Sequence, residues 1–217
     1  MPHTNARRPR RNRRKKQGGA IRALLLGLCA VMLMGLLALG FRALQRSRVA
    51  RYPVLYTREI QFYALENQVP APLLAAMIMA ESSYDPNAVS GVGARGLMQV
   101  MPETGAWIAG KLDEPFSEQA LFEPDVSIRY GAWYMGFLLR RYEGDFTCAV
   151  AAYHAGQGNV DAWLKNPQYS NDGVTLDVIP TEDTATYAGR VLRARDVYRK
   201  YYFPVPDEAQ EGDSPDA

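Results

Sequence analysis

Cysteine and histidine are both scarce in this sequence of 217 residues, which has only Cys29 and Cys148 and only His3 and His154. The two cysteines lie far apart, one in an apolar run and one in a helix-like stretch, so we predict no intramolecular disulfide. Two thiols and two imidazoles do not match the spacing of zinc ligands, and we expect no metal site and no cofactor. The sequence also lacks a glycine-rich phosphate loop and the motif of a serine or cysteine nucleophile.

Acidic residues are absent from residues 1–51, which carry 13 basic side chains. Residues 52–217 carry 12 basic and 23 acidic side chains, so a basic arm precedes an acidic body. An acidic body repels the phosphates of nucleic acid, and we therefore exclude nucleic acid as its ligand. The arm is densest between Arg7 and Lys16, where eight of ten residues are Arg or Lys.

One long run, residues 23–41, contains no charged residue. As a helix it would span roughly 29 Å at about 1.5 Å per residue, close to the hydrocarbon thickness of a bilayer. We predict a transmembrane anchor at 23–41, a cytoplasmic basic arm at 1–22 and a linker at 42–57. A cleaved secretory signal is the alternative, because Ala38-Leu39-Gly40 resembles a cleavage site, but the run is longer than the core of such a signal.

The body shows helical spacing throughout, with no alternating strand pattern of useful length, and predicts an all-α domain over residues 58–203. Residues 87–101 have the composition of a loop, and the acidic residues 204–217 that of a disordered tail. Leu55, Ile60, Phe62, Tyr63 and Leu65 are expected to pack inward from the first helix. The expected helices are residues 54–68, about 70–82, 102–107, 124–142, one capped by Asp145, and one capped by Thr184 that runs to about residue 202.

Glu81 ends an apolar helix with the sequence MIMAES. A negative charge at a helix C-terminus opposes the helix dipole, and apolar neighbours disfavour an ionised carboxylate. Both effects raise the pKa, which suits a general acid near neutral pH. For a lone glutamate, a solvated helix end is the ordinary alternative.

Two further segments have the composition of ligand-binding elements. In residues 90–102, glycines allow a ligand to approach the backbone, and Gln99 offers a donor and an acceptor to a sugar. In residues 152–156, small residues flank Tyr153 and His154. Taken singly, the first segment is typical of a turn, and Tyr153 and Tyr187 are typical of a core.

Taken in order, these segments resemble the lytic transglycosylases of the soluble-lytic-transglycosylase (SLT) type. The likeness covers about residues 58–200 and departs from the family pattern at His154 (usually Asn), Asp183 (usually Glu) and Ser127 (commonly Asn). The matching elements are Glu81-Ser82, the GLMQ segment at 93–99 followed by Pro102 and Thr104, residues 121–134, the AYHAG segment at 152–156 continued by Gly158, Val160 and Trp163, and residues 179–187.

The resemblance implies an all-α body within the α+β lysozyme-like superfamily, acting as a peptidoglycan lytic transglycosylase. Such an enzyme cleaves the β-1,4 bond between N-acetylmuramic acid (MurNAc) and N-acetylglucosamine (GlcNAc) without water. Glu81 would protonate the leaving oxygen and then accept the C6 hydroxyl proton, giving 1,6-anhydro-MurNAc ends, while the substrate's N-acetyl group replaces a second carboxylate. The substrate-binding residues implied are Ser82, Ser90, Gly96, Met98, Gln99, Tyr153, His154 and Tyr187.

The expected partners are peptidoglycan glycan strands and the cytoplasmic membrane, which residues 23–41 would cross once with the catalytic domain on the cell-wall side. Protein partners are not indicated. Two alternatives stay open: a hydrolytic muramidase, for which Asp85 and Glu103 are the acids nearby in sequence, and a non-catalytic scaffold that binds peptidoglycan.

Overall fold

The computed structural model describes residues 25–28, 32–42 and 50–204, and the chain divides into two units, residues 1–51 and 52–217. In the first unit, residues 25–28 and 32–42 are helical, and the stretch Leu25–Arg42 has a mean hydropathy of 2.1, so by length and composition it could cross a membrane. A secretory signal near an N-terminus meets the same criteria. The predicted arm at 1–22, Cys29 and residues 205–217 of the predicted tail lie outside the described residues.

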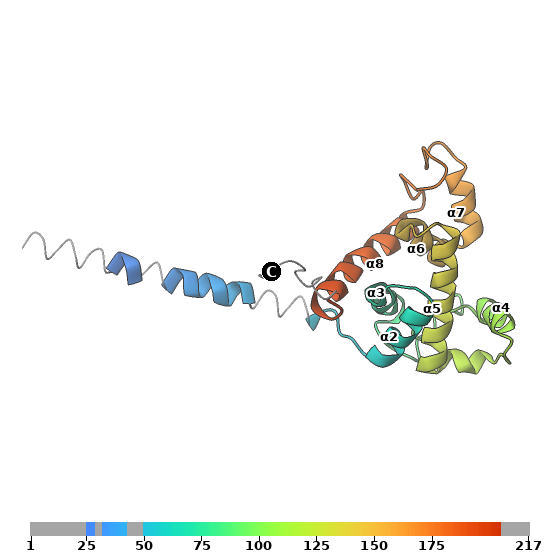
Figure 1. Cartoon of the computed structure of the whole chain (residues 1–217), viewed down its shortest axis with the longest axis horizontal. Helices are drawn as coiled ribbons and strands as arrows, with labels where there is room; N and C mark the ends of the chain where they lie inside the picture. Colours follow the sequence, from blue (N-terminus) through green and yellow to red (C-terminus); the bar gives the residue numbers. More distant parts are fainter. Residues whose placement is uncertain (1–24, 29–31, 43–49, 205–217) are drawn as a thin grey trace, which may run out of the picture. The chain divides into compact units, whose positions relative to one another are not determined.

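The second unit is helical, which confirms the predicted fold class (Figure 1). Between residues 50 and 204 the only β-structure is two isolated bridges, Val89 with Arg95 and Arg95 with Val100. The elements are α2 (Thr57–Glu66), α3 (Ala71–Ser82), α4 (Pro102–Leu112), the 3-10 helix η1 (Glu118–Phe122), α5 (Pro124–Arg141), α6 (Phe146–Ala155), α7 (Gln157–Leu164) and α8 (Glu182–Tyr201).

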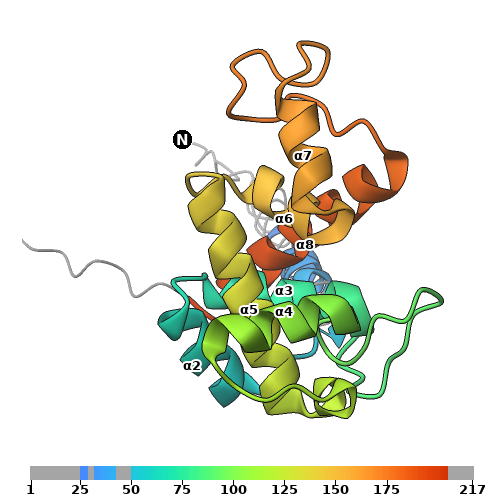
Figure 2. The same ribbon diagram turned by 90° about the vertical axis from the view of Figure 1, so that its right-hand side faces the viewer.

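Helix α3 lies among the other helices and packs against α8 and α2 (Figure 2). Its residues from Leu73 to Ile78 are completely buried. A helix that is apolar on every side belongs in a core, which explains why this segment shows no polar face. The last turn of α3 emerges from the core and carries Glu81.

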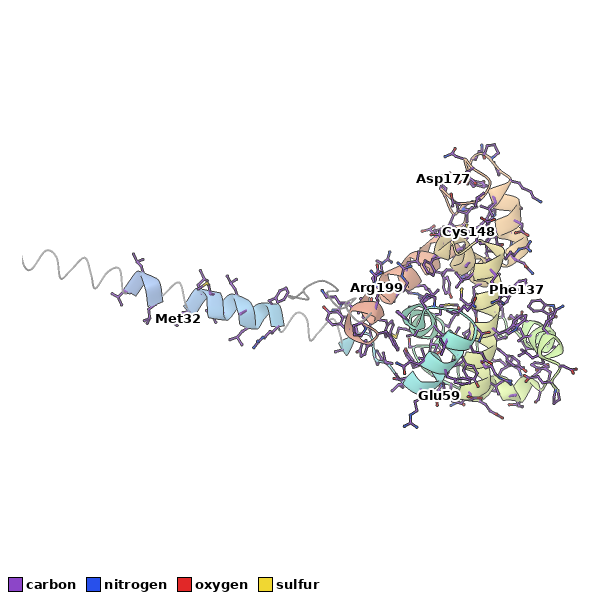
Figure 3. The ribbon with its side chains drawn as sticks, viewed as in Figure 1. Met32, Glu59, Phe137, Cys148, Asp177 and Arg199 are labelled. Carbon is purple, nitrogen blue, oxygen red and sulfur yellow. The ribbon has the colours of Figure 1, made fainter. Side chains whose placement is uncertain are left out.

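Several expected helix features agree with the structure. The predicted apolar face of α5 is buried, with Ile128, Met135 and Leu138 fully enclosed. The Asp145 carboxylate accepts a hydrogen bond from the Cys148 amide at 2.6 Å and caps α6 as predicted. Cys148 itself is a free, buried thiol on α6 (Figure 3).

Other expectations were wrong. Helix α8 begins after Thr181, and Thr184 lies buried inside its first turn, so Thr184 is not the cap. Leu55, Phe62 and Leu65 are 51%, 62% and 83% exposed, because α2 covers the core with a single face. Helix α4 continues beyond residue 107 to Leu112, and both η1 and α7 were not predicted.

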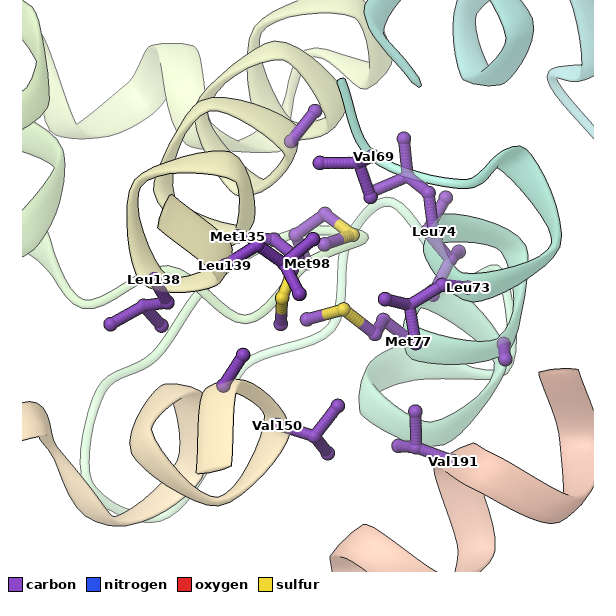
Figure 4. Packing of buried hydrophobic residues seen from close by; sticks show 14 of the residues in the cluster. Val69, Leu73, Leu74, Met77, Met98, Met135, Leu138, Leu139, Val150 and Val191 are labelled. Carbon is purple, nitrogen blue, oxygen red and sulfur yellow. The ribbon is translucent and has the colours of Figure 1, made fainter. Parts of the chain in front are cut away.

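The loop between α3 and α4 is inserted into the core. Leu97 and Met98 are fully buried, and Met98 lies among core side chains that include Met77 and Met135 (Figure 4). The turn before them needs glycine, because Gly96 has a φ of +73°. A Cβ atom there would lie 1.9 Å from the Leu121 carbonyl oxygen, so the loop and η1 approach each other as closely as backbones can.

We expect Gly96→Ala to lower the free energy of unfolding by about 2–4 kcal/mol, because it adds both backbone strain and a steric clash. Gly91→Ala is the matched control in the same loop, since a Cβ atom added at Gly91 would meet nothing within 4 Å. Urea denaturation of both variants measures the difference. Equal stabilities would contradict the close approach of this turn to Leu121.

Candidate active site

The candidate site is centred on Glu81, in the last turn of α3. The side chain is half-buried, and burial raises the pKa of its carboxyl to about 7. A hydrogen bond from Tyr187 and the charge of Arg190 act in the opposite direction and moderate the rise. The environment expected from the apolar sequence around Glu81 is therefore present: a carboxyl that exchanges its proton near neutral pH.

Helix α8 holds this carboxyl in place. The Tyr187 hydroxyl donates a hydrogen bond of 2.5 Å to Oε1 of Glu81, and only 3% of Tyr187 is exposed. Burial and the neighbouring Glu81 charge raise the pKa of Tyr187 well above its usual value, so its hydroxyl keeps the proton that it donates. One turn later, Arg190 donates to the Ala80 carbonyl at 3.0 Å. Helix α8 thus fixes both the side chain of Glu81 and the backbone before it.

Tyr153 connects α6 to the loop that follows α3. Its hydroxyl donates to the carbonyl oxygen of Met98 at 2.9 Å. Burial and the charge of Glu81 raise the pKa of Tyr153 well above its usual value. Its ring also meets Tyr134 of α5 at a centroid distance of 5.4 Å. Tyr153 therefore brings α5, α6 and the loop together beside Glu81.

The polar loop residues predicted to bind substrate make hydrogen bonds to the backbone. Ser82 donates to the Leu97 carbonyl at 2.9 Å and to the Ile78 carbonyl at 3.2 Å. Ser90 accepts from the Ala94 amide at 2.9 Å. Gln99, at a φ of +46°, donates through Nε2 to the carbonyls of Gly96 (2.9 Å) and Ala88 (3.1 Å). These groups hold the loop in its shape, and their contact with a ligand stays a prediction.

Gly96 and Met98 have a packing role in this structure. Both residues are buried, and the Met98 side chain lies so close to α5 that a Cβ atom on Gly131 would come within 2.5 Å of it. The Met98 amide donates to the Ser127 hydroxyl at 3.2 Å, so Ser127 of α5 also holds this part of the loop. A fully buried side chain offers a ligand no surface, so Met98 belongs to the core and contributes to the site through its carbonyl oxygen.

His154 lies at the C-terminal end of α6, beside Tyr187. The two rings stack with centroids 4.6 Å apart and planes 27° apart. Nδ1 of His154 is 3.1 Å from the Thr184 hydroxyl oxygen. Burial lowers the pKa of His154, while the charge of Asp183 opposes that shift. The structure thus brings together His154, Tyr187 and Glu81 from three different helices.

A pocket of about 310 Å³ lies between α4, α5 and the start of α7, lined by Glu103, Thr104, Trp107, Tyr134 and Gln157. The Trp107 side chain of α4 is 38% exposed. Its ring makes edge-to-face contacts with three aromatic rings of α5, those of Trp133, Tyr134 and Phe137. Figure 3 shows Phe137 on α5. Sequence reasoning missed this pocket. The aromatic residues at 133, 134 and 137 were its signal, because that spacing places them together on one side of a helix.

A metal centre is not indicated: the residues that the structure describes include no group of three or more His, Cys, Asp or Glu side chains able to hold a metal ion. Asp85 is exposed and accepts a hydrogen bond from the Asn87 amide at 2.9 Å, as a turn-forming residue does. Glu103 is exposed in the first turn of α4. Glu81 is therefore the enclosed carboxyl among the three acids considered from the sequence.

Comparison with known proteins gives consistent matches over the second unit. Residues 58–174 match the model of the "Transglycosylase SLT domain" family. The soluble lytic murein transglycosylase of Escherichia coli K12 is 32% identical over 155 residues, which are 70% of this chain and 24% of that protein. The membrane-bound lytic murein transglycosylase C of Serratia proteamaculans is 32% identical over 124 residues, 52% of this chain and 33% of that protein.

A solved structure shows the same fold. The lytic transglycosylase Slt of Pseudomonas aeruginosa, crystallised as an inactive mutant with Gln in place of Glu, superposes with a TM-score of 0.64 and 34% identity. The match covers 71% of this chain and 26% of that one, so the chain spans about a quarter of the length of the soluble proteins it resembles. The lysozyme-like fold expected from the sequence is confirmed, and the chain belongs to the transglycosylase SLT domain family.

Proposed function

We propose that this chain is a lytic transglycosylase that cleaves the β-1,4 bond between MurNAc and GlcNAc in peptidoglycan and leaves 1,6-anhydro-MurNAc ends. The observation that carries the proposal is the half-buried Glu81 carboxyl, with a pKa of about 7 and a 2.5 Å bond from Tyr187. Family membership and similarity to lytic murein transglycosylases support the reaction class.

The surroundings of Glu81 suit a group that acts first as an acid and then as a base. Below pH 7 the protonated carboxyl donates its proton to the glycosidic oxygen. The carboxylate that remains is stabilised by the Tyr187 hydroxyl and by the charge of Arg190. It then accepts the proton of the C6 hydroxyl as the anhydro ring closes. A pKa near the working pH serves both steps, because neither proton transfer is strongly uphill.

A hydrolytic muramidase would use a second enclosed carboxylate. Of the three acids considered, Glu81, Asp85 and Glu103, only Glu81 is enclosed. Asp85 and Glu103 are both exposed, and Asp85 is already engaged in a turn. The substrate's own N-acetyl group then stabilises the cationic sugar carbon. A non-catalytic scaffold would gain nothing from a costly buried carboxyl, which further favours an enzyme.

The pocket at Trp107 supports binding of a glycan strand. Aromatic faces pack against the apolar faces of sugar rings, and Glu103, Thr104 and Gln157 offer polar partners to hydroxyl and amide groups. Tyr134 lines the pocket and contacts Tyr153, which connects the pocket to the surroundings of Glu81. A strand bound at Glu81 would therefore find a second contact region on α4 and α5.

We propose further that the helix Leu25–Arg42 anchors the chain in the cytoplasmic membrane, with the second unit on the cell-wall side. Its length and hydropathy support a span, and the similarity to a membrane-bound lytic murein transglycosylase is consistent with one. The larger basic cluster precedes the helix, which favours an N-terminus in the cytoplasm.

Glu81→Gln should fold normally and lower turnover on purified sacculi by about 10²–10⁴-fold or more, because the amide cannot donate or accept the catalytic proton. Mass spectrometry of the released muropeptides measures both the amount and the chemistry of the product. Glu66→Gln, an exposed glutamate on α2, is the control and should keep full activity. Products one water heavier from the unaltered enzyme would identify a hydrolase, and activity in Glu81→Gln would remove Glu81 from the mechanism.

The activity of the unaltered enzyme should fall as pH rises through about 7, since Glu81 then loses the proton it donates. Tyr187→Phe removes a bond that favours the ionised carboxyl, so the pKa of Glu81 rises and the basic limb of the profile moves to higher pH. We expect kcat to fall by about 10–100-fold, the worth of a charge-assisted hydrogen bond. Tyr56→Phe is the control, and an unmoved basic limb in Tyr187→Phe would contradict this role.

The intact mass of the protein purified from membranes should include residues 1–41, because an anchor is not removed. The full chain should stay in the membrane after alkaline extraction, whereas residues 52–217 alone should be released. A mature chain that begins near residue 41 would instead identify a cleaved signal.

A further inference from the structure

His154 places a titratable ring next to Tyr187 and Glu81. Its ring covers one side of Tyr187, with centroids 4.6 Å apart, and Nδ1 is 3.1 Å from the Thr184 hydroxyl. Tyr187 in turn donates to Glu81 at 2.5 Å. His154 therefore limits where the Tyr187 ring lies, and the Tyr187 ring determines where its hydroxyl meets Glu81.

The charged groups around His154 come mainly from α8. Asp183 attracts a proton to the imidazole, whereas Arg190 repels one, and Arg190 also lies 5.8 Å from the centre of the Tyr187 ring. Glu81 of α3 accepts the hydrogen bond from Tyr187, the residue on which His154 stacks. On the other helices that pack against α6, Asp161 of α7 forms an ion pair with Arg141 of α5.

We propose that His154 is a positioning residue: its neutral imidazole holds Tyr187 in the orientation that bonds Glu81, and its protonation sets the acid limit of the enzyme's pH range. This inference rests on the proposed function, since it concerns the regulation of the same site. His154 transfers no proton to the glycan in this role. It takes up a proton from solvent and acts through Tyr187.

The stack favours the neutral ring for two physical reasons. Burial lowers the pKa of His154, so by linkage its protonation must weaken the packed arrangement. An imidazolium would also place a second positive charge near Arg190, the residue that donates to the Ala80 carbonyl beside Glu81. Protonation therefore disturbs both contacts that α8 makes around the catalytic carboxyl.

The test compares kcat and KM against pH for the full chain in detergent and for His154→Asn. We expect kcat of the unaltered enzyme to fall several-fold as the pH is lowered below about 6.5, the ordinary pKa of histidine, because the pKa of His154 is lowered by burial. Asn is polar and carries no charge, so His154→Asn should lose this acid limb and keep the basic limb near pH 7. An identical acid limb in both proteins, or a fall caused by KM alone, would overturn the proposal.

Asp183→Asn tests the same coupling by removing a charge beside His154 and leaving the imidazole in place. Asp183 raises the pKa of His154, so its removal should move the acid limb to lower pH. Asp196→Asn removes the same charge from the same helix, where Asp196 pairs with Arg195 and Arg199, and should leave the limb in place. Equal shifts in the two variants would indicate a general charge effect and contradict a role for the pair Asp183 and His154.

A readout independent of catalysis separates failure of this inference from failure of the proposed function. In NMR titrations of the full chain in detergent, the ring signals of Tyr187 should shift with the protonation of His154, and the shift should vanish in His154→Asn. If products other than anhydro-muropeptides appear but the Tyr187 signals follow His154, the proposed function fails and the coupling stands. If Tyr187 does not follow His154, the inference fails.

Discussion

The site depends on the packing of α8 against α3. That contact buries the end of α3, which raises the pKa of Glu81, and it also supplies the Tyr187 hydroxyl that limits the rise. Burial alone would raise the pKa of Glu81 further, so that the carboxyl would ionise only at higher pH. The hydrogen bond alone would leave the carboxyl ionised at neutral pH. The two opposing effects come from one interface, so the position of α8 determines the protonation behaviour of Glu81.

The sequence predicted the features that depend on local pattern. The apolar run before Glu81, the proline that starts α5 and the aspartate that caps α6 each act within a few residues of their own position. The apolar residues before Glu81 predicted the raised pKa of its carboxyl, but the local pattern alone also fitted a solvated helix end, and the resemblance to the family singled this glutamate out. The resemblance to the family predicted that Tyr187 belongs to the site. Its hydroxyl donates to Glu81, 106 residues earlier in the chain.

Features that depend on distant neighbours were not predicted. The burial of Met98 depends on Gly131 of α5, and Thr184, expected as a cap, lies inside the first turn of α8 and contacts His154 of α6. Phe62 and Leu65 were expected to pack inward because of their helical spacing, but α2 needs only one face for packing. In each case the outcome depends on which other elements pack against the helix, and the pattern along one helix does not contain that information.

The loop after α3 is held from several directions: by the Tyr153 hydroxyl, by Ser127, by the close approach of Gly96 to Leu121, and by the burial of Met98 in the core. The buried part of this loop, residues 94–100, cannot change its conformation around a ligand without breaking core packing. In the proposed reaction, the distortion that leads to the transition state would therefore fall on the sugar ring and not on this part of the loop. A preformed backbone of this kind would determine where the bound ring lies relative to Glu81.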